Sequence, residues 1–187
     1  PSKPIGPFFS EEDARLHTAK DGWTLKEDAG RGWRRVVPSP RPLAIVEEPV
    51  IRELLRRNIV VIAVGGGGIP VVKQRGGLLA GCAAVIDKDA ASALLAAHLK
   101  ADLLVISTGV DKVAINFGKP DQRDLDKLSV AEARRYLKQG QFAPGSMKPK
   151  IEAALYFLQH GGRRVIITQP HLLEQAVAGR TGTHLVR

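Results

Sequence analysis

The sequence predicts an α/β protein, a three-layer α/β/α sandwich with a mainly parallel sheet and a small protruding subdomain. Beyond residue 42, short apolar runs alternate with helix-like stretches, an order typical of a parallel sheet covered by helices. One of these runs, Ile59–Val64, leads directly into four consecutive glycines, as a buried strand leads into a ligand-binding loop. The chain has 187 residues, of which 44% are hydrophobic, so it is long enough to bury one real core.

Residues 1–42 differ from the rest and predict a lid-like, protruding subdomain. They contain six of the 12 prolines and both tryptophans. Ser10 precedes three acidic residues, which is the pattern of a helix N-cap, and Leu25–Val37 is expected to form a hairpin about Gly30–Gly32. The prolines of Pro38–Pro42 predict a stiff connector. We expect this subdomain to bury little apolar surface and to be mobile, and residues 43–187 to form the second domain.

Five stretches after residue 42 carry helix signals. The first places Val50, Leu54 and Leu55 on one face, and the second is almost entirely alanine and leucine on its inner side. A capping box formed by Ser129 and Glu132 starts the third, and a glycine pair ends the fourth. The expected helices span Pro49–Arg57, Asp87–Lys100, Ser129–Gly140, Lys148–His160 and His171–Ala178.

Short apolar runs bounded by turn residues predict the strands. The expected strands span Ile59–Val64, Leu103–Ser107, Lys112–Phe117, Val165–Thr168 and Thr183–Val186. Between the first two, three further glycines break up a loop that has room for a small hairpin. Ligands of parallel sheets bind beyond the carboxyl ends of the strands. The glycine loop and the turn that begins at Ser107 therefore mark the expected ligand side.

The four glycines Gly65, Gly66, Gly67 and Gly68 predict an anion-binding loop. Glycine reaches positive φ at little steric cost and lets a ligand approach the backbone N–H groups closely. A dinucleotide-binding loop fits poorly, because Pro70 stands at the third glycine position and no helix pattern follows. The GxxxxGK[ST] pattern of a P-loop is absent from the sequence. The alternative is that these glycines serve tight packing alone.

Two lysines occupy predicted helix starts, where the helix dipole disfavours a cation. Lys88 lies between Asp87 and Asp89, and Lys150 follows Pro149. A bound phosphate close to both would explain these positions, with an aspartate orienting Lys88 rather than acting as a base. The alternative is an ordinary surface helix start that an aspartate caps. Together with the glycine loop, the lysines predict phosphoryl transfer, in which catalysis rests on positioning and charge neutralisation.

The formal net charge of +9 indicates an anionic partner, although a solvated basic surface would account for it as well. The densest basic cluster, Arg31–Arg35, contains Trp33. Nucleic-acid binding is nevertheless disfavoured, because aromatic residues are only 5% of the chain and no binding motif is present. No apolar run approaches the roughly 18 residues of a membrane span, and the opening residues carry no signal-peptide pattern. With Cys82 as the single cysteine, we expect a reducing, cytoplasmic setting.

Five motifs, taken in this order and spacing, resemble those of the carbamate kinases, members of the amino acid kinase family. They span Pro1–Phe8, Gly65–Val71, Ala84–Asp89, Asp111–Pro120 and Gly145–Lys150. The resemblance covers essentially the whole chain. It implies an amino acid kinase-like fold, in which 43–187 is the C-terminal nucleotide-binding part. It also implies reversible phosphoryl transfer between ATP and carbamate, run physiologically from carbamoyl phosphate and ADP with Mg²⁺, by a cytoplasmic homodimer of arginine metabolism.

The resemblance also implies roles for individual residues. The transferring phosphoryl group would be neutralised by Lys3, Lys88 and Lys150, and Asp89 would hold the lysines in place. The four glycines from Gly65 to Gly68 would lie at the carbamate and phosphoryl site. The nucleotide pocket would be lined by Thr108, Asp111, Val113, Phe117 and Met147. The segment 1–42 would include the subdomain that closes over the site.

The chain departs from the family pattern at its start. The family begins with a strand and a Gly-Gly-Asn loop that binds phosphate, and neither is present before Pro1, which also lacks a preceding Met. We therefore expect the chain to be a fragment that is inactive alone. Lys148 stands where relatives often have a small or neutral residue. A catalytically silent protein that binds a nucleotide or metabolite and regulates is the alternative function.

Overall fold

The computed structural model describes residues 3–187. The chain divides into two compact units. The first combines the described residues up to Arg41 with Gly66–Asp87, and the second combines Pro42–Gly65 with Lys88–Arg187. The predicted roles of the segments 1–42 and 43–187 stay predictions.

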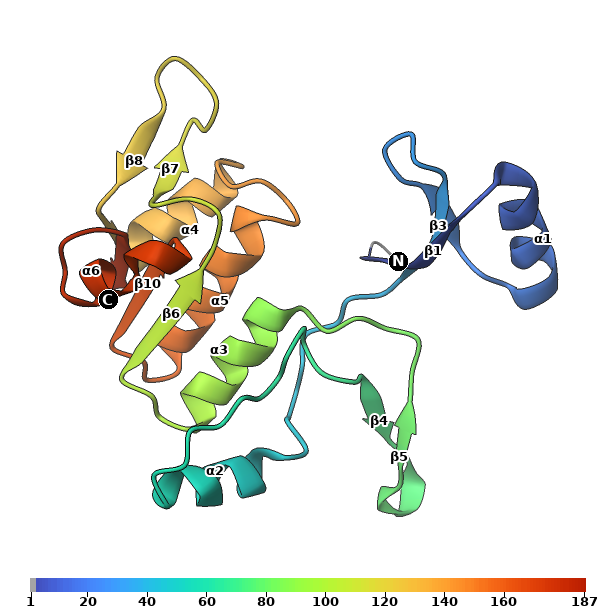
Figure 1. The fold of residues 1–187 in the computed structure, drawn as a ribbon, viewed down its shortest axis with the longest axis horizontal. Coiled ribbons are helices and arrows are strands. Elements are labelled where there is room, and N and C mark those ends of the chain that lie inside the picture. Colours follow the sequence, from blue (N-terminus) through green and yellow to red (C-terminus); the bar gives the residue numbers. More distant parts are fainter. Residues whose placement is uncertain (1–2) are drawn as a thin grey trace. The chain divides into compact units, whose positions relative to one another are not determined.

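The first unit contains a three-stranded antiparallel sheet with one helix (Figure 1). Its elements are β1 (Lys3–Phe9), α1 (Glu11–Asp21), β2 (Leu25–Glu27) and β3 (Trp33–Val37). The strand order β1-β3-β2 confirms the predicted hairpin of β2 and β3. The predicted N-cap is also confirmed, because the Ser10 hydroxyl accepts a hydrogen bond from the Asp13 backbone N–H at 3.1 Å.

Strand β1 was not predicted. Its prolines, Pro4 and Pro7, are typical of a loop, and they hide the strand signal. Proline is tolerated in a strand at the edge of a sheet, because its missing N–H can face the side where no neighbouring strand needs a hydrogen bond. β1 is such an edge strand, paired on one side only, with β3.

Few apolar side chains of the first unit are buried, and stacked aromatic and cationic groups complete its packing. Among the described residues of this unit, the buried apolar side chains are Ala14, Val36 and Val37. The His17 ring stacks on Trp23 with centroids 4.6 Å apart, and the Arg35 guanidinium lies 4.4 Å from the centroid of that tryptophan.

The unit also includes the hairpin of β4 (Val71–Lys73) and β5 (Leu79–Gly81), joined by the 3-10 turn η1 (Arg75–Gly77), which confirms the predicted small hairpin.

The second unit is built on a four-stranded sheet in the order β6-β10-β11-β9. The strands are β6 (Leu103–Ser107), β9 (Lys127–Ser129), β10 (Arg164–Thr168) and β11 (Thr183–Val186). β10 runs parallel to β6, and β11 runs parallel to β9, but β10 and β11 are antiparallel. The α/β class is confirmed. The prediction of a mainly parallel sheet holds in part, because the pairings of β6 with β10 and of β9 with β11 are parallel, whereas that of β10 with β11 is antiparallel.

The short connection between β10 and β11 explains this reversal. It holds the 3-10 turn η2 (Pro170–Leu172) and α6 (Leu173–Val177), which together form the predicted last helix. A five-residue helix rises only about 7.5 Å, whereas a five-residue strand is about 16 Å long. The helix is too short to carry the chain back along the strand for a parallel crossover, and the sequence pattern of the strands does not encode their direction.

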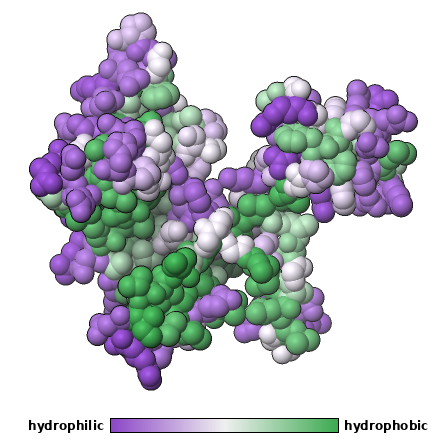
Figure 2. All heavy atoms as spheres, in the orientation of Figure 1, coloured by the Kyte–Doolittle hydropathy of each residue, from purple (hydrophilic) through white to green (hydrophobic). Residues whose placement is uncertain are grey.

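The predicted buried strand at Ile59–Val64 is wrong. These residues form neither helix nor strand, and the exposed fractions of Val60 and Ile62 are 92% and 98%. An apolar β-branched run signals a strand covered on both faces, but burial requires neighbouring strands, and residues 3–187 pair none with this segment. Figure 2 shows apolar residues gathered over the region of α2 (Glu48–Arg56), the helix that precedes this run.

Three helices cover the sheet of the second unit, and they confirm the predicted elements. They are α3 (Lys88–His98), α4 (Val130–Lys138) and α5 (Met147–Gln159). The capping box at Ser129 and Glu132 is present, with both reciprocal hydrogen bonds formed. The expected extended piece after residue 112 forms β7 (Val113–Ile115), which pairs antiparallel with β8 (Arg123–Leu125). In the part of the chain that is described, no helix is long and apolar enough to span a bilayer.

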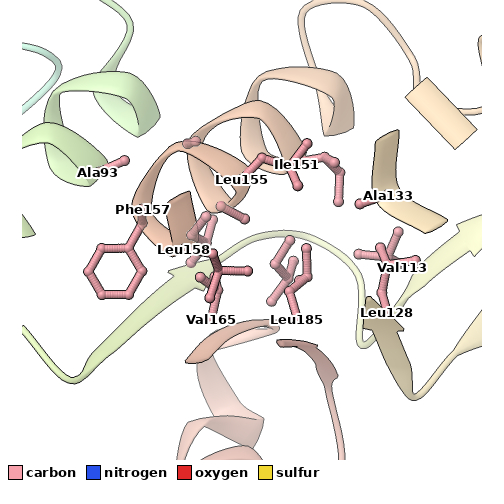
Figure 3. Close-up of a cluster of buried hydrophobic side chains, with 14 of the residues drawn as sticks. Ala93, Val113, Leu128, Ala133, Ile151, Leu155, Phe157, Leu158, Val165 and Leu185 are labelled. Atoms are coloured by element: carbon pink, nitrogen blue, oxygen red, sulfur yellow. The ribbon is translucent and has the colours of Figure 1, made fainter. Parts of the chain in front are cut away.

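Helix α5 lies at the centre of the core, as Figure 3 shows. It contributes Ile151, Leu155, Phe157 and Leu158, which pack with the cluster that includes Val113, Leu128, Val165 and Leu185. Because α3 joins the same cluster through its alanines, α3 and α5 lie against each other. This contact brings the first turns of the two helices together, and both predicted lysines lie in those turns.

An ionic cluster joins α2 to the end of α3. The Glu48 carboxylate lies 2.7 Å from His98 Nδ1 and accepts a hydrogen bond of 2.7 Å from Arg52, which also donates to the His98 carbonyl oxygen. The hydrogen bonds from His98 and then Arg52 lower the pKa of Glu48 below its ordinary value of 4.5. The ionised carboxylate thus stabilises the fold above the pKa of the unfolded state, and this contribution is lost as the pH falls through the lowered pKa.

Substitution Glu48→Gln is expected to lower the free energy of unfolding at pH 7 by about 0.5–1 kcal/mol, because the glutamine cannot form the charged hydrogen bonds. The difference from the unsubstituted protein should shrink as the pH falls below about 4.5. Urea unfolding at pH 7 and pH 3 measures it. Glu53→Gln is the control, since Glu53 lies on the same helix and is 51% exposed in its ion pairs. Equal losses at pH 7 for both variants would contradict the account.

Candidate functional site

The central feature of the second unit is an ionic cluster of three predicted site residues. The Lys150 Nζ lies 3.0 Å from Asp89 Oδ2, and the Lys88 Nζ lies 3.3 and 3.4 Å from the two oxygens of the same carboxylate. Lys88 and Asp89 begin α3, and Lys150 lies in the first turn of α5. Residues 61 positions apart are therefore brought together by the packing of these two helices.

Burial differs sharply between the two lysines. The side chains of Lys150 and Asp89 are only 9% and 10% exposed, whereas that of Lys88 is 55% exposed. A buried ammonium requires a nearby counter-ion, and Asp89 supplies it. Two ammonium groups and one carboxylate leave one net positive charge. The first turns of α3 and α5 place the positive ends of two helix dipoles beside that charge, so the cluster favours an anion at its exposed side.

A pocket of about 120 Å³ adjoins this cluster. It lies between the first turns of α3 and the carboxyl end of β6, which is where ligands bind in parallel strand–helix units. Its lining residues are Gly65, Lys88, Asp89, Ser92, Leu104, Val105, Ile106 and Ser107. Drug-sized ligands occupy pockets of roughly 300–1,000 Å³. The volume at Lys88 is therefore suited to a group as small as a phosphoryl or carboxylate.

The glycine loop divides between the two units. Gly65 lines the pocket, whereas Gly66, Gly67 and Gly68 belong to the first unit. The backbone φ is positive at Gly65, Gly67 and Gly68, which explains the residue type at those positions. A Cβ at Gly65, Gly66 or Gly68 would meet no atom within 4 Å. Tight packing therefore does not account for these three glycines, whose role in binding stays a prediction.

Lys3, predicted to act with the other lysines, lies in the first unit. Its Nζ donates to Asp87 Oδ2 at 3.1 Å, and the two side chains are 32% and 21% exposed. The sequence offered Asp87 as a helix cap or as an aspartate that orients Lys88. Its pairing with Lys3 could not be found by pattern, because the two residues are 84 positions apart. The predicted role of Lys3 at the phosphoryl group stays a prediction.

The five predicted nucleotide-binding residues lie elsewhere in the second unit. Val113 is fully buried in the core, and its backbone N–H donates to Thr183 Oγ1. Phe117 is 68% exposed, and Met147 packs partly buried against the core. Thr108 donates its backbone N–H to the Thr168 carbonyl oxygen, and Asp111 is exposed. The lining of the pocket at Lys88, drawn from the described residues, includes none of the five.

Two hydroxyl-bearing residues of the pocket, Ser92 and Ser107, were missed as site residues. Ser92 lies within an alanine-rich helix, where a single serine forms no motif. Ser107 ends β6, and only its place at a strand end marked it.

Among residues 3–187, no group of three histidine, cysteine, aspartate or glutamate side chains is arranged to hold a metal ion.

Known proteins resemble the chain along its whole length. It is 53% identical over 188 aligned positions to the carbamate kinase-like protein YahI of Escherichia coli and 51% identical over 187 to the carbamate kinase of Thermococcus kodakarensis. All of the chain aligns in both cases, with 60% and 59% of those relatives. The carbamate kinase of Giardia lamblia bound to AMP-PNP matches the structure with a TM-score of 0.93 at 46% identity, over 100% of this chain and 59% of that one.

The chain thus spans about 60% of the length of the curated relatives it matches. The model of the amino acid kinase family matches residues 12–169. The resemblance drawn from the sequence motifs is confirmed by these matches. The chain belongs to the amino acid kinase family, and it is similar to carbamate kinases and to a carbamate kinase-like protein of that family.

Proposed function

We propose that this chain is the part of a carbamate kinase that carries the lysines of its phosphoryl-transfer site. The observation that carries the proposal is the Lys88–Asp89–Lys150 cluster beside a small pocket at the ligand end of β6. The reaction is reversible transfer of a phosphoryl group between ATP and carbamate, and its physiological direction makes ATP from ADP and carbamoyl phosphate. Relatives that are carbamate kinases by name support this choice of substrate.

The cluster would act by neutralising charge rather than by proton transfer. A transferring phosphoryl group carries negative charge on three oxygens, and fixed cations stabilise that charge in the transition state. Lys150, held by Asp89 in a buried position, is already oriented before the substrate binds. Asp89 lies between two ammonium groups and serves as their counter-ion. Its role is to position the lysines.

The remaining assignments belong to the same proposal. Lys3 and the glycines from Gly65 to Gly68 would contact the phosphoryl group and carbamate. The nucleotide would be bound by the residues Thr108, Asp111, Val113, Phe117 and Met147. Mg²⁺ would arrive with ADP or ATP, because Mg²⁺ is usually held through substrate phosphates. The protein would be a cytoplasmic homodimer in which 1–42 belongs to a closing lid.

The test is ATP formation by the full-length protein that contains this chain, supplied with ADP, Mg²⁺ and carbamoyl phosphate. We expect ATP to accumulate with carbamoyl phosphate and far more slowly with acetyl phosphate, which lacks the amino group. The 187-residue chain alone should form none.

A silent regulatory protein is the second candidate, favoured by the likeness to a carbamate kinase-like protein. Binding of ADP measured by calorimetry, without ATP formation from either acyl phosphate, would establish that candidate and reject the enzyme. Equal rates with both acyl phosphates would contradict the assignment of carbamate as the acceptor.

A further inference from the structure

Ser92 presents the one hydroxyl on the α3 side of the pocket at Lys88. It lies three residues after Asp89 and four after Lys88, so all three side chains share one face of the helix. All three line the same pocket of about 120 Å³. The buried residues of α3, which include Ala91, Ala93 and Leu94, point to the core instead.

The hydroxyl brings no benefit to the helix itself. Serine is a weaker helix former than alanine, because its side chain competes for backbone hydrogen bonds. The neighbours of Ser92 on both sides are alanines. The side chain is half-buried and lies at a pocket wall rather than in the apolar core. A ligand that enters the pocket therefore explains the Ser92 hydroxyl better than the stability of the fold does.

The charge beside the pocket selects the group that the hydroxyl would meet. Lys88 and Asp89 line the pocket together with the apolar residues Leu104, Val105 and Ile106. Lys150 is not part of this lining, but it is bonded to Asp89, so the three charged side chains together leave one net positive charge beside the pocket. An oxygen of an anion held by Lys88 would lie on the helix face that also carries Ser92. A neutral O–H donor beside a cation adds a directed hydrogen bond to a charged oxygen, and such bonds are stronger than those between neutral groups.

We propose that Ser92 is a substrate-contacting residue whose hydroxyl donates a hydrogen bond to an oxygen of the phosphoryl group being transferred. This inference rests on the proposed function. The phosphoryl group enters with carbamoyl phosphate when ATP is made and with ATP when carbamate is phosphorylated. A contact to that group therefore concerns one substrate in each direction, and ADP and carbamate lack it.

The experiment determines KM for all four substrates with the full-length protein and its Ser92→Ala variant. The KM values of carbamoyl phosphate and of ATP should each rise roughly tenfold, the cost of one hydrogen bond to a charged group. Those of ADP and carbamate should stay within about twofold, because a lost contact affects only ligands that make it. Ser92→Thr, which keeps the hydroxyl, should restore part of the loss.

Ser129→Ala is the matched control, since it removes a serine hydroxyl that caps α4 and lines no part of this pocket. It should lower the melting temperature and leave all four KM values unchanged. In Ser92→Ala, a rise in KM for ADP and ATP alone, or for carbamoyl phosphate and carbamate alone, would overturn the proposal. Four unchanged KM values would overturn it as well. Absence of activity in the unsubstituted protein would instead reject the proposed function.

Discussion

Replacement of Lys150 by methionine in the full-length protein is expected to lower kcat for ATP formation by about a hundred- to ten-thousandfold, the range seen when one transition-state charge contact is removed. Methionine fills most of the lysine volume but carries no charge. Lys150 is the buried cation of the cluster, and Lys88 alone, at 55% exposure, is screened by solvent. Steady-state kinetics with carbamoyl phosphate and ADP measures the loss.

The control for this substitution is Lys138→Met, which removes an exposed lysine from the last turn of α4. Its kcat should remain within about twofold of the unsubstituted protein, because exposed charges far from a site contribute little. Removing Lys150 also leaves Asp89 with one lysine fewer, so circular dichroism and melting temperature must show that the variant is folded. A folded Lys150→Met protein with near-normal kcat would contradict the role of Lys150.

Phe157→Ala is expected to lower the free energy of unfolding by about 3–5 kcal/mol, which is the usual cost of removing a buried phenyl ring. Phe157 is fully buried within the core cluster of the second unit, as Figure 3 shows. Urea unfolding of the full-length protein measures the effect. Tyr156→Ala is the control, because Tyr156 is the neighbouring residue on α5, is only partly buried and stacks on His160.

The ring of Phe157 also explains Gly162, which follows α5. A Cβ at Gly162 would overlap three carbon atoms of that ring, so Gly162→Ala alone should cost about 1–3 kcal/mol by overpacking. In the Phe157→Ala background the overlap is gone, and Gly162→Ala should be close to neutral. Equal costs of Gly162→Ala in the two backgrounds would show that the ring is not the cause.

Local signals were sufficient for most elements of the fold. The N-cap at Ser10, the capping box at Ser129 and the apolar runs of β6 and β10 each depend on residues close together in the sequence, and all are confirmed. The failures depend on partners. The strands β1, β8 and β9 were not predicted, and they are strands because β3, β7 and β11 pair with them. Ile59–Val64 is exposed because no described strand flanks it, and β11 runs antiparallel to β10 because α6 is short.

For the site too, local signals predict some residues, and only the packing of the fold brings out the others. Lys88 and Lys150 were found because a lysine at a helix start contradicts the dipole, which is a local signal. Their meeting at Asp89 depends on the packing of α3 against α5, which no local pattern contains. No sequence pattern marked Ser92 as a site residue, because only the pocket at the end of β6 distinguishes it from a surface serine.

The proposed phosphoryl site depends on an ammonium group at position 150, held by Asp89. Lys150→Cys, made in a background in which Cys82 and any other cysteine are replaced by serine, should be nearly inactive. Treatment with 2-bromoethylamine converts the new thiol into a thioether analogue of lysine and restores the ammonium at that position. We expect kcat to rise by at least roughly tenfold, because the lost charge contact is restored. Complete modification by mass spectrometry with no rise in kcat would contradict it.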